Sequence, residues 1–314
     1  MDKTGYEKEI KNGIYEKTLD SWEKFGEFVA DSELCPPTCI FRGQANSKWL
    51  VESTLDRMEK RFPKKPNLSG GTTKEFSIPC VERDLQLDRF KEMARGKLTN
   101  PPKEDEEDEW WTLAQHHGLA TPMLDWVYSP FVALFFAFED KRCWCKEKDG
   151  ESKVYKEPES RAVFALAHQI VREKETDDKP APRPFSPKGH ANYRLVNQGG
   201  VFLKMPEPEY EDECGKRHII KRHIDLETYV CENFTADTYR KASDENGKSK
   251  TQPRAILRKV IMPNNKDRIE CLKFLDHMNI NRSSLFPDLD GAARYVNDLW
   301  EVNFDKAIGH INRE

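Results

Sequence analysis

Residues 116–138 read HHGLATPMLDWVYSPFVALFFAF, and this stretch decides the fold. Its second half begins with Ser129 and Pro130 and continues in apolar residues to Phe138. A serine N-cap followed by a proline in the first turn is typical of a helix start, and apolar residues on nearly every side indicate a buried helix. The first half carries two histidines, a glycine, a threonine and an aspartate. Polar groups beside the N-terminus of a buried helix are well placed to bind an anion.

A second polar cluster, Phe41-Arg42-Gly43-Gln44, ends a short β-prone run that starts at Thr38. An arginine at the end of a strand presents a rigid fork of donors that suits phosphate or carboxylate. We expect Gly43 to end the strand and to let a ligand approach the backbone closely. We therefore interpret this cluster and the segment from His116 to Pro130 as two walls of one ligand pocket.

Each cluster also has a plainer interpretation. Arg42 alone is compatible with a surface arginine that follows a strand. In the second segment, Asp125 and Ser129 would only cap the helix, and Trp126 would only fill the core. The segment as a whole favours a site, because a mere connection rarely needs so many reactive side chains.

The composition indicates a folded core that carries solvated insertions. The chain has 314 residues, of which 37% are hydrophobic and 34% are charged, and its 17 Phe and 7 Trp residues supply large apolar surfaces. The formal net charge of −4 gives no reason to expect a generic nucleic-acid or membrane binder. We find neither an apolar run of membrane-spanning length nor a secretory signal, so we expect a cytoplasmic protein with reduced cysteines and no membrane partner.

Short strands intermixed with helices predict an α+β fold, a mixed sheet core with surrounding helices and polar insertions. We expect a single domain over residues 1–314, because no insertion shows an apolar periodicity of its own. Residues 1–17 are expected to be a polar lead-in and residues 173–190 a loop. The insertions are expected near 59–74, 141–160 and 206–250. The patterns predict helices over 18–31, 80–95, 129–138, 225–241, 266–278 and 289–300, and strands over 38–41, 162–171, 201–203 and 255–262.

Taken together, the motifs make the sequence resemble the FRG domain family, which is named for its Phe/Tyr-Arg-Gly motif. They occur in family order between about residues 18 and 300, which makes the resemblance specific. The matching segments are FRGQ at 41–44, WLVESTLDR at 49–57, HGLATPMLDW at 117–126, SPFVALFFA at 129–137, NYRLVNQGGVF at 192–202 and LFPDLDG at 285–291.

FRG domains in turn resemble ADP-ribosyltransferases, which implies an NAD-binding site. In that fold an arginine or histidine ends the first strand, a helix with small residues backs the nicotinamide, and a Glu or Gln on a later strand does the chemistry. Arg42, the segment Ala133–Ala137 and Gln198 match these positions. A neutral glutamine can only hydrogen-bond the ribose, whereas a glutamate would stabilise the developing cation. Either Gln198 only orients the ribose, or Asp125 supplies the charge, or the enzyme interpretation is wrong.

The resemblance thus implies a set of site residues. Arg42 and the backbone near Gly118 would bind the pyrophosphate, and Trp126 or Tyr128 would stack on the nicotinamide. The expected catalytic residues are Arg42, Gln198 and Asp125. The expected NAD-binding residues are Arg42, Gly43, Gln44, His117, Gly118, Thr121, Trp126 and Ser129.

The resemblance also bears on partners, because ADP-ribosylating enzymes of this kind are often toxins in bacterial phage defence. It implies an RNA, DNA or protein acceptor and a neutralising antitoxin protein. Basic stretches at 216–223 and 254–259, with Tyr210 and Tyr229, could form a nucleic-acid groove or simply a solvated face. Two other functions stay open: a non-catalytic nucleotide- or nucleic-acid-binding module, and a structural interaction protein.

We expect no bound metal. Cys35 and Cys39 could join Cys143 and Cys145 in a zinc site, but their spacing is unusual for one. Asp288-Leu-Asp-Gly291 lacks the further ligands of a calcium loop, so we expect it to cap the last helix.

Overall fold

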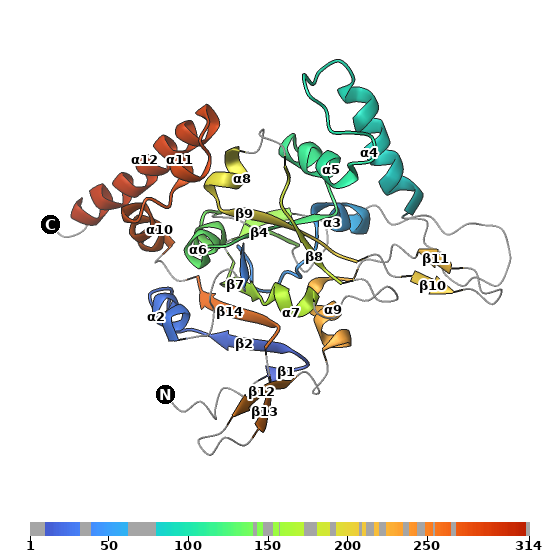
Figure 1. Cartoon of the computed structure of the whole chain (residues 1–314). Coiled ribbons are helices and arrows are strands. Elements are labelled where there is room, and N and C mark those ends of the chain that lie inside the picture. The colour runs from blue at the N-terminus through green and yellow to red at the C-terminus, as the bar shows by residue number, and fades with distance from the viewer. Residues whose placement is uncertain are drawn as a thin grey trace.

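The computed structural model describes residues 10–31, 39–61, 80–140, 143–146, 153–156, 158–172, 181–188, 193–206, 209–211, 217–219, 224–234, 239–243, 249–253, 255–264 and 268–311 (Figure 1). Within these residues, eight strands form one mixed sheet in the order β1-β2-β14-β7-β3-β4-β9-β8. Neighbouring strands are antiparallel, except that β2 and β14 run parallel. They are β1 (Ile10–Lys11), β2 (Ile14–Thr18), β3 (Ile40–Gln44), β4 (Met123–Val127), β7 (Ser160–Leu166), β8 (Arg183–Phe185), β9 (Gly200–Lys204) and β14 (Leu257–Pro263).

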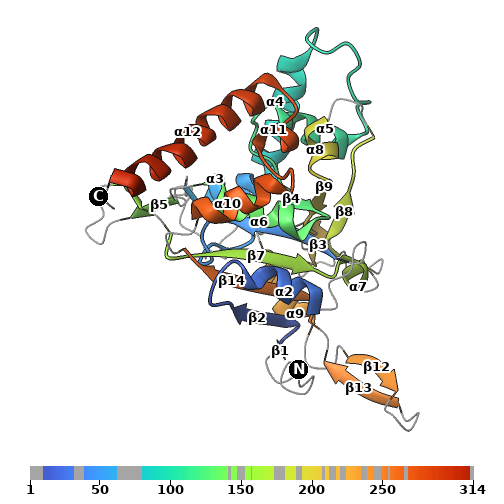
Figure 2. The ribbon, with the colours of Figure 1, turned by 90° about the vertical axis from the view of Figure 1, so that its left-hand side faces the viewer.

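Helices pack around this sheet, which confirms the predicted α+β class (Figures 1 and 2). Helix α6 (Pro130–Phe138) lies on β3, β4 and β7 and contacts α10 (Arg268–His277). Both views place α8, α11 and the start of α12 close together. The other helices are α2 (Lys24–Asp31), α3 (Thr54–Arg61), α4 (Cys80–Ala94), α5 (Glu107–His116), α7 (His168–Arg172), α8 (Tyr193–Asn197), α9 (Leu226–Asn233), α11 (Arg282–Leu285) and α12 (Leu289–Ile311).

Three antiparallel hairpins stand outside the main sheet, within two of the predicted insertions. Strands β5 and β6 lie in the insertion at 141–160. Strands β10, β11 and β12 lie in the insertion at 206–250, and β13 continues past its end to Pro253. The hairpin of β12 and β13 projects away from the sheet in both views (Figures 1 and 2). The strands are β5 (Cys143–Lys146), β6 (Lys153–Lys156), β10 (Glu209–Glu211), β11 (Arg217–Ile219), β12 (Tyr239–Ser243) and β13 (Ser249–Pro253).

Strand β7 forms the centre of the sheet and of the core. It pairs with β14 on one side and with β3 on the other, and every residue from Arg161 to Leu166 is buried. The predicted strand over 162–171 is correct to Leu166 and wrong beyond it, because α7 begins at His168. Arg161 is fully buried and donates through Nη1 to the carbonyl oxygen of Ala137 (2.5 Å), so it satisfies the end of α6.

The predicted polar lead-in over residues 1–17 is wrong for the residues from Ile10 onward. Asn12 and Gly13, with φ angles of 47° and 75°, make the turn between β1 and β2. An Asn-Gly pair between two strands is the strongest local hairpin signal, because both positions need φ above zero. The pair β1 and β2 therefore extends the sheet beyond β14.

Other element boundaries also differ from the predictions. The helix expected over 18–31 starts at Lys24, because the amide of Leu19 still bonds Ile261 of β14 (2.8 Å). The helix expected over 225–241 ends at Asn233, and residues 239–243 form β12 instead. The loop expected over 173–190 contains the edge strand β8. The helices near 80–95, 129–138, 266–278 and 289–300 and the strands near 201–203 and 255–262 are confirmed by α4, α6, α10, α12, β9 and β14.

Gly43 brings β3 and α6 into direct backbone contact. Contrary to our prediction it does not end the strand, since β3 continues to Gln44. A Cβ atom at this position would lie 2.0 Å from the carbonyl oxygen of Ala133 and 2.5 Å from the amide nitrogen of Ala137. Only glycine lets α6 approach the strand this closely, and the alanines leave room on the helix side.

We predict that Gly43→Ala lowers the free energy of unfolding by about 1–3 kcal/mol or more, because the added methyl group overpacks a backbone contact. Urea unfolding monitored by tryptophan fluorescence measures this change. Gly26→Ala is the matched control, because Gly26 lies in α2 and its added Cβ would be 4.0 Å from the nearest atom, in Phe131. Equal stabilities of the two variants would contradict the close contact.

Candidate functional site

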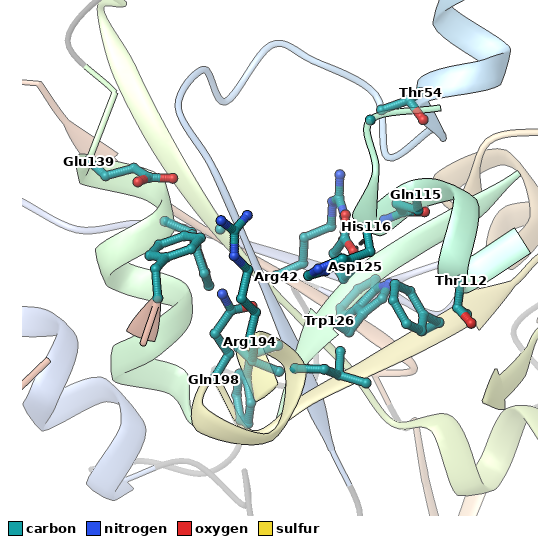
Figure 3. Close-up of a pocket in the computed structure, with 18 of the residues that line it drawn as sticks. Arg42, Thr54, Thr112, Gln115, His116, Asp125, Trp126, Glu139, Arg194 and Gln198 are labelled. Carbon is teal, nitrogen blue, oxygen red and sulfur yellow. Dashed lines mark hydrogen bonds between the residues drawn. The ribbon is translucent and has the colours of Figure 1, made fainter. Parts of the chain in front are cut away.

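A cavity of about 570 Å³ lies where β3 and β4 diverge (Figure 3). Among the described residues these strands pair only at Phe41 and Val127, whereas each pairs at five positions with its other neighbour. Residues of both strands line the cavity, together with residues of α5 and α8. The volume is typical of a pocket that encloses a small molecule.

Arg42 bridges the gap between the two strands. Its Nη1 atom donates to the backbone carbonyl oxygen of Asp125 at 2.6 Å, so a side chain of β3 bonds β4 where the strand backbones have separated. Its Nε atom is buried and has no hydrogen-bond partner in the described part of the chain. Burial lowers the pKa of Arg42 to about 10, against the opposing attraction of Asp125, so the guanidinium stays charged at neutral pH.

The Asp125 carboxylate lies beside Arg42 and is held from one side. Gln115 Nε2 donates to its Oδ1 atom at 2.6 Å, and the Thr121 hydroxyl donates in turn to Gln115 Oε1. No other side chain of the described residues donates a hydrogen bond to this carboxylate. The side chain is open to the cavity but surrounded by protein, and this partial desolvation raises the pKa of Asp125, although the charge of Arg42 acts in the opposite direction.

The opposite wall comes from α8 and from the turn before α12. Arg194 Nε donates to Asp288 Oδ2 at 2.6 Å, and its guanidinium lies 5.6 Å from the centre of the Phe286 ring. Gln198 Nε2 donates to the carbonyl oxygen of Leu285 at 3.2 Å. The end of α11 therefore holds Gln198, and the turn before α12 holds Arg194.

Asp288 also accepts a hydrogen bond from the amide of Gly291 (2.8 Å) at the start of α12. The predicted capping role of this segment is thus confirmed. The same carboxylate thus caps the helix and accepts from Arg194. Both hydrogen bonds lower the pKa of Asp288, and the bond from Arg194 is the largest cause.

Two further titratable groups line the cavity. Burial is the main cause that lowers the pKa of His116, and the neighbouring His117 and Arg194 add to the effect. Burial also raises the pKa of Glu139, at the end of α6, to about 7, although Arg282 Nη1 lies 2.9 Å from its carboxylate and favours the charged form. His116 and Glu139 lie apart in Figure 3, with Arg42 and Arg194 between them.

The structure brings some predicted site residues together and leaves others out. Gln198 lines the cavity, but it lies in the turn between α8 and β9 and not on a strand. Trp126 is 1% exposed, so it fills the core as in the plainer interpretation, although it is also among the lining residues. The predicted residues that line the cavity are Arg42, Gly43, Gly118, Asp125, Trp126 and Gln198.

Four predicted NAD-binding residues do not line the cavity. Gln44 is buried and donates to the carbonyl oxygen of Leu50 (3.2 Å). His117 is exposed at the end of α5, and the Ser129 hydroxyl caps α6 by accepting from the amide of Val132 (3.3 Å). Thr121 is fully buried and contacts the site through Gln115 and Thr54, which both line the cavity.

Two more expectations for this segment need correction. The plainer interpretation of Asp125 as a helix cap is wrong, because residues 123–127 form β4. Tyr128, which we expected to stack on the nicotinamide, is 37% exposed and does not line the cavity.

Helix α5 was not predicted, and neither were the site residues that it contributes. Thr112, Gln115 and His116 all line the cavity, and their spacing of three and four residues places them on one face of a helix. That spacing was a usable signal. Arg194, Glu139 and Phe286 were also missed, and no local pattern connects them, because they come from three separate elements.

Other predicted sites receive less support. Among the described residues no group of three or more His, Cys, Asp or Glu side chains could hold a metal ion, and Cys35 lies outside those residues. Of the suggested nucleic-acid groove, Arg258 and Tyr229 are buried and Lys259 pairs with Glu227 (3.1 Å). Arg254 and most of the stretch at 216–223 lie outside the described part of the chain. No helix in that part is long and apolar enough to cross a membrane.

Residues 37–144 match the family model of the FRG domain. The matched region contains β3, α5, β4 and α6, and thus Arg42, Gln115 and Asp125, while α8 and the turn before α12 lie beyond it. Searches among curated proteins and among solved structures give no significant match. This part of the chain is therefore similar to the FRG domain, and one wall of the cavity lies within it.

We predict a pH dependence of stability that originates from Glu139. Its folded pKa of about 7 lies above the ordinary 4.5, so the folded chain binds more protons than the unfolded chain between these pH values. This contribution to the free energy of unfolding is fully present below about pH 4.5 and is lost as the pH rises to 7, by at most about 1.4 kcal/mol per pH unit. Urea unfolding of the wild type and Glu139→Gln across this window measures it as a fall in the stability of the wild type relative to the variant as the pH rises. Glu27→Gln, at an exposed position of α2, is the control, and a difference independent of pH would contradict the prediction.

Proposed function

We propose that the chain is an NAD-dependent ADP-ribosyltransferase that acts on a macromolecular acceptor, and that the cavity binds the nicotinamide end of NAD. The observation that carries the proposal is that the charged Arg42, which bonds the backbone of Asp125, and the exposed Asp125 carboxylate line one cavity of about 570 Å³. The resemblance to the FRG family, and through it to ADP-ribosyltransferases, points to the same substrate. NAD is the substrate in this proposal, and no metal takes part.

The reaction breaks the bond between the nicotinamide nitrogen and C1′ of the ribose. Nicotinamide leaves with the bonding electrons, and positive charge develops on C1′ and the ring oxygen. A carboxylate stabilises this charge better than an amide does. Asp125 is therefore our candidate for this role rather than Gln198, because the Gln198 amide is neutral and already bonds Leu285. A hydroxyl or amine of the acceptor then bonds C1′ and gives its proton to Asp125 or to water.

The acceptor class and the biological role rest on the resemblance alone. We propose RNA, DNA or protein as the acceptor, a role as a toxin in bacterial phage defence, and a neutralising antitoxin as partner. In the absence of an acceptor, water would take its place, and the chain would hydrolyse NAD.

A non-catalytic nucleotide-binding module is the second candidate. The observation that favours it is Gln198, which is a neutral glutamine in place of the glutamate that would stabilise the cation, lies in a turn and not on a strand, and bonds the backbone of Leu285. Such a module would bind NAD or another nucleotide in the same cavity and release no nicotinamide.

We predict that the pure chain releases nicotinamide from NAD and that Arg42→Ala and Asp125→Asn each slow this release by about 100-fold or more, because each removes a charge from the site of the reaction. Chromatography of released nicotinamide, with and without RNA, DNA or protein, measures the rate. Arg183→Ala is the matched control, because Arg183 pairs with Asp108 and does not line the cavity.

The outcome separates the two candidates. If calorimetry shows NAD binding but no nicotinamide is released under any of these conditions, the result contradicts the enzyme and supports the binding module. Full activity of an Arg42→Ala variant that urea unfolding shows to be folded would mean that the reaction does not take place in this cavity.

A further inference from the structure

Helix α12 turns polar side chains toward the protein. The Tyr295 hydroxyl donates to Asp276 Oδ1 of α10 at 3.1 Å, and Arg282 Nε of α11 donates to Asp298 Oδ2 at 2.7 Å. Tyr295 and Asp298 are three residues apart and both partly buried, so they lie on one face of the helix. These two bonds fix which side of α12 faces the solvent.

The opposite face of α12 is apolar and exposed. It consists of Leu289, Ala293, Val296 and Trp300, which we call the apolar face of α12. The exposed fractions of Leu289, Val296 and Trp300 are 89%, 54% and 74%. A surface helix normally points its apolar side chains toward the core and its polar side chains to solvent, whereas α12 does the reverse. An exposed apolar surface of this kind marks a contact with another molecule.

The spacing of the apolar face is the same from either end. Its residues are separated by four, three and four positions, over about three turns of the helix. Alternating spacings of three and four are typical of the seam between two paired helices. In an antiparallel pair with a twofold axis between Ala293 and Val296, Leu289 lies opposite Trp300 of the second copy, and Ala293 lies opposite Val296 of the second copy. A twofold contact requires this self-complementarity, because both copies use the same surface.

The charges beside the apolar face neither repel a second copy nor attract an anion. Each acid between Asp288 and Trp300 pairs with an arginine, and the sequence has no lysine in this segment. The pairs are Asp288 with Arg194 (2.6 Å), Asp290 with Arg294 (3.2 Å) and Asp298 with Arg282 (2.7 Å). A nucleic acid or an anionic membrane would be attracted by unpaired positive charge, which this segment does not offer. Two copies of the segment can therefore meet without charge repulsion.

We infer that the apolar face of α12 is the contact between two copies of the chain, whose α12 helices pair antiparallel about a twofold axis. The contact covers Trp300 of each copy with Leu289 of the other. A twofold contact closes on itself, so it yields a dimer and no larger assembly. The inference goes beyond the proposed function and does not depend on it. The contact adjoins the cavity, because Asp288 caps the same helix and bonds Arg194 in the cavity wall.

Sedimentation equilibrium of the full chain over the micromolar range tests this inference, and we expect a dimer. Leu289→Lys and Trp300→Glu should each weaken the dimer by about 100-fold or more, because each places a charge against an apolar side chain at two symmetric contacts. An equimolar mixture of the two variants should recover the dimer. In the mixed dimer the introduced lysine lies opposite the introduced glutamate, and the second contact keeps Leu289 opposite Trp300.

A matched control separates the contact from a general effect of charge. Met93 is 66% exposed near the end of α4, which lies apart from α12 in Figure 1. Met93→Glu introduces the same charge as Trp300→Glu at another exposed apolar position and should leave the dimer unchanged. Circular dichroism of each variant verifies that its helices are intact, so that a lost dimer is not a lost fold.

Three results would overturn the inference. The first is a wild-type chain that stays monomeric over the whole range, and binding of this monomer to phosphatidylcholine vesicles would assign the apolar face to a membrane instead. The second is a dimer that Trp300→Glu does not weaken, because its contact then lies elsewhere. The third is a pair of folded variants that stay monomeric when mixed, which excludes the antiparallel pairing. A wild-type dimer that each variant loses and the mixture recovers supports the inference.

Discussion

The site depends on one hydrogen bond, from the Arg42 guanidinium to the backbone carbonyl of Asp125. Strands β3 and β4 are neighbours in the sheet but pair at a single position in the described structure, so their backbones have separated at the cavity. An opening in a sheet exposes unpaired backbone groups, which carry a cost unless another group bonds them. Arg42 bonds one of these backbone groups and at the same time places a positive charge in the opening. The same side chain therefore stabilises the opened sheet and contributes to the candidate site.

The two walls of the cavity have different supports. The wall formed by β3, β4 and α5 belongs to the core, where Gly43 brings α6 against the sheet and Thr121 anchors Gln115. The other wall is tied together by contacts among α8, α11 and the start of α12, in which Arg194 bonds the carboxylate that caps α12. Arg282 adds a link from α11 to Glu139 at the end of α6. A ligand in the cavity would therefore contact both the sheet core and the C-terminal helices.

Local patterns predicted much of the fold and part of the site. Ser129 and Pro130 predicted the start of α6, and the apolar run predicted its burial, because helix caps and burial depend on residues close in sequence. Arg42, Asp125 and Gln198 were predicted to share a site and all line the cavity. The same patterns placed Thr121 and Ser129 in the binding set, although one supports Gln115 and the other caps a helix. Sequence proximity identified the right segment but not the direction of each side chain.

The sequence by itself determined the α+β class, the buried helix α6, the strands β7, β9 and β14 and the segments that carry the site, since these depend on periodicity, capping and motif order. Only the tertiary structure decided that Gly43 packs on a helix instead of ending a strand, and that Gln115 rather than Ser129 or His117 supports the site. It also decided that Arg194, Glu139 and Phe286 complete the cavity. These relations join residues far apart in the chain, and the separation of β3 from β4, which no local pattern encodes, creates the space in which they meet.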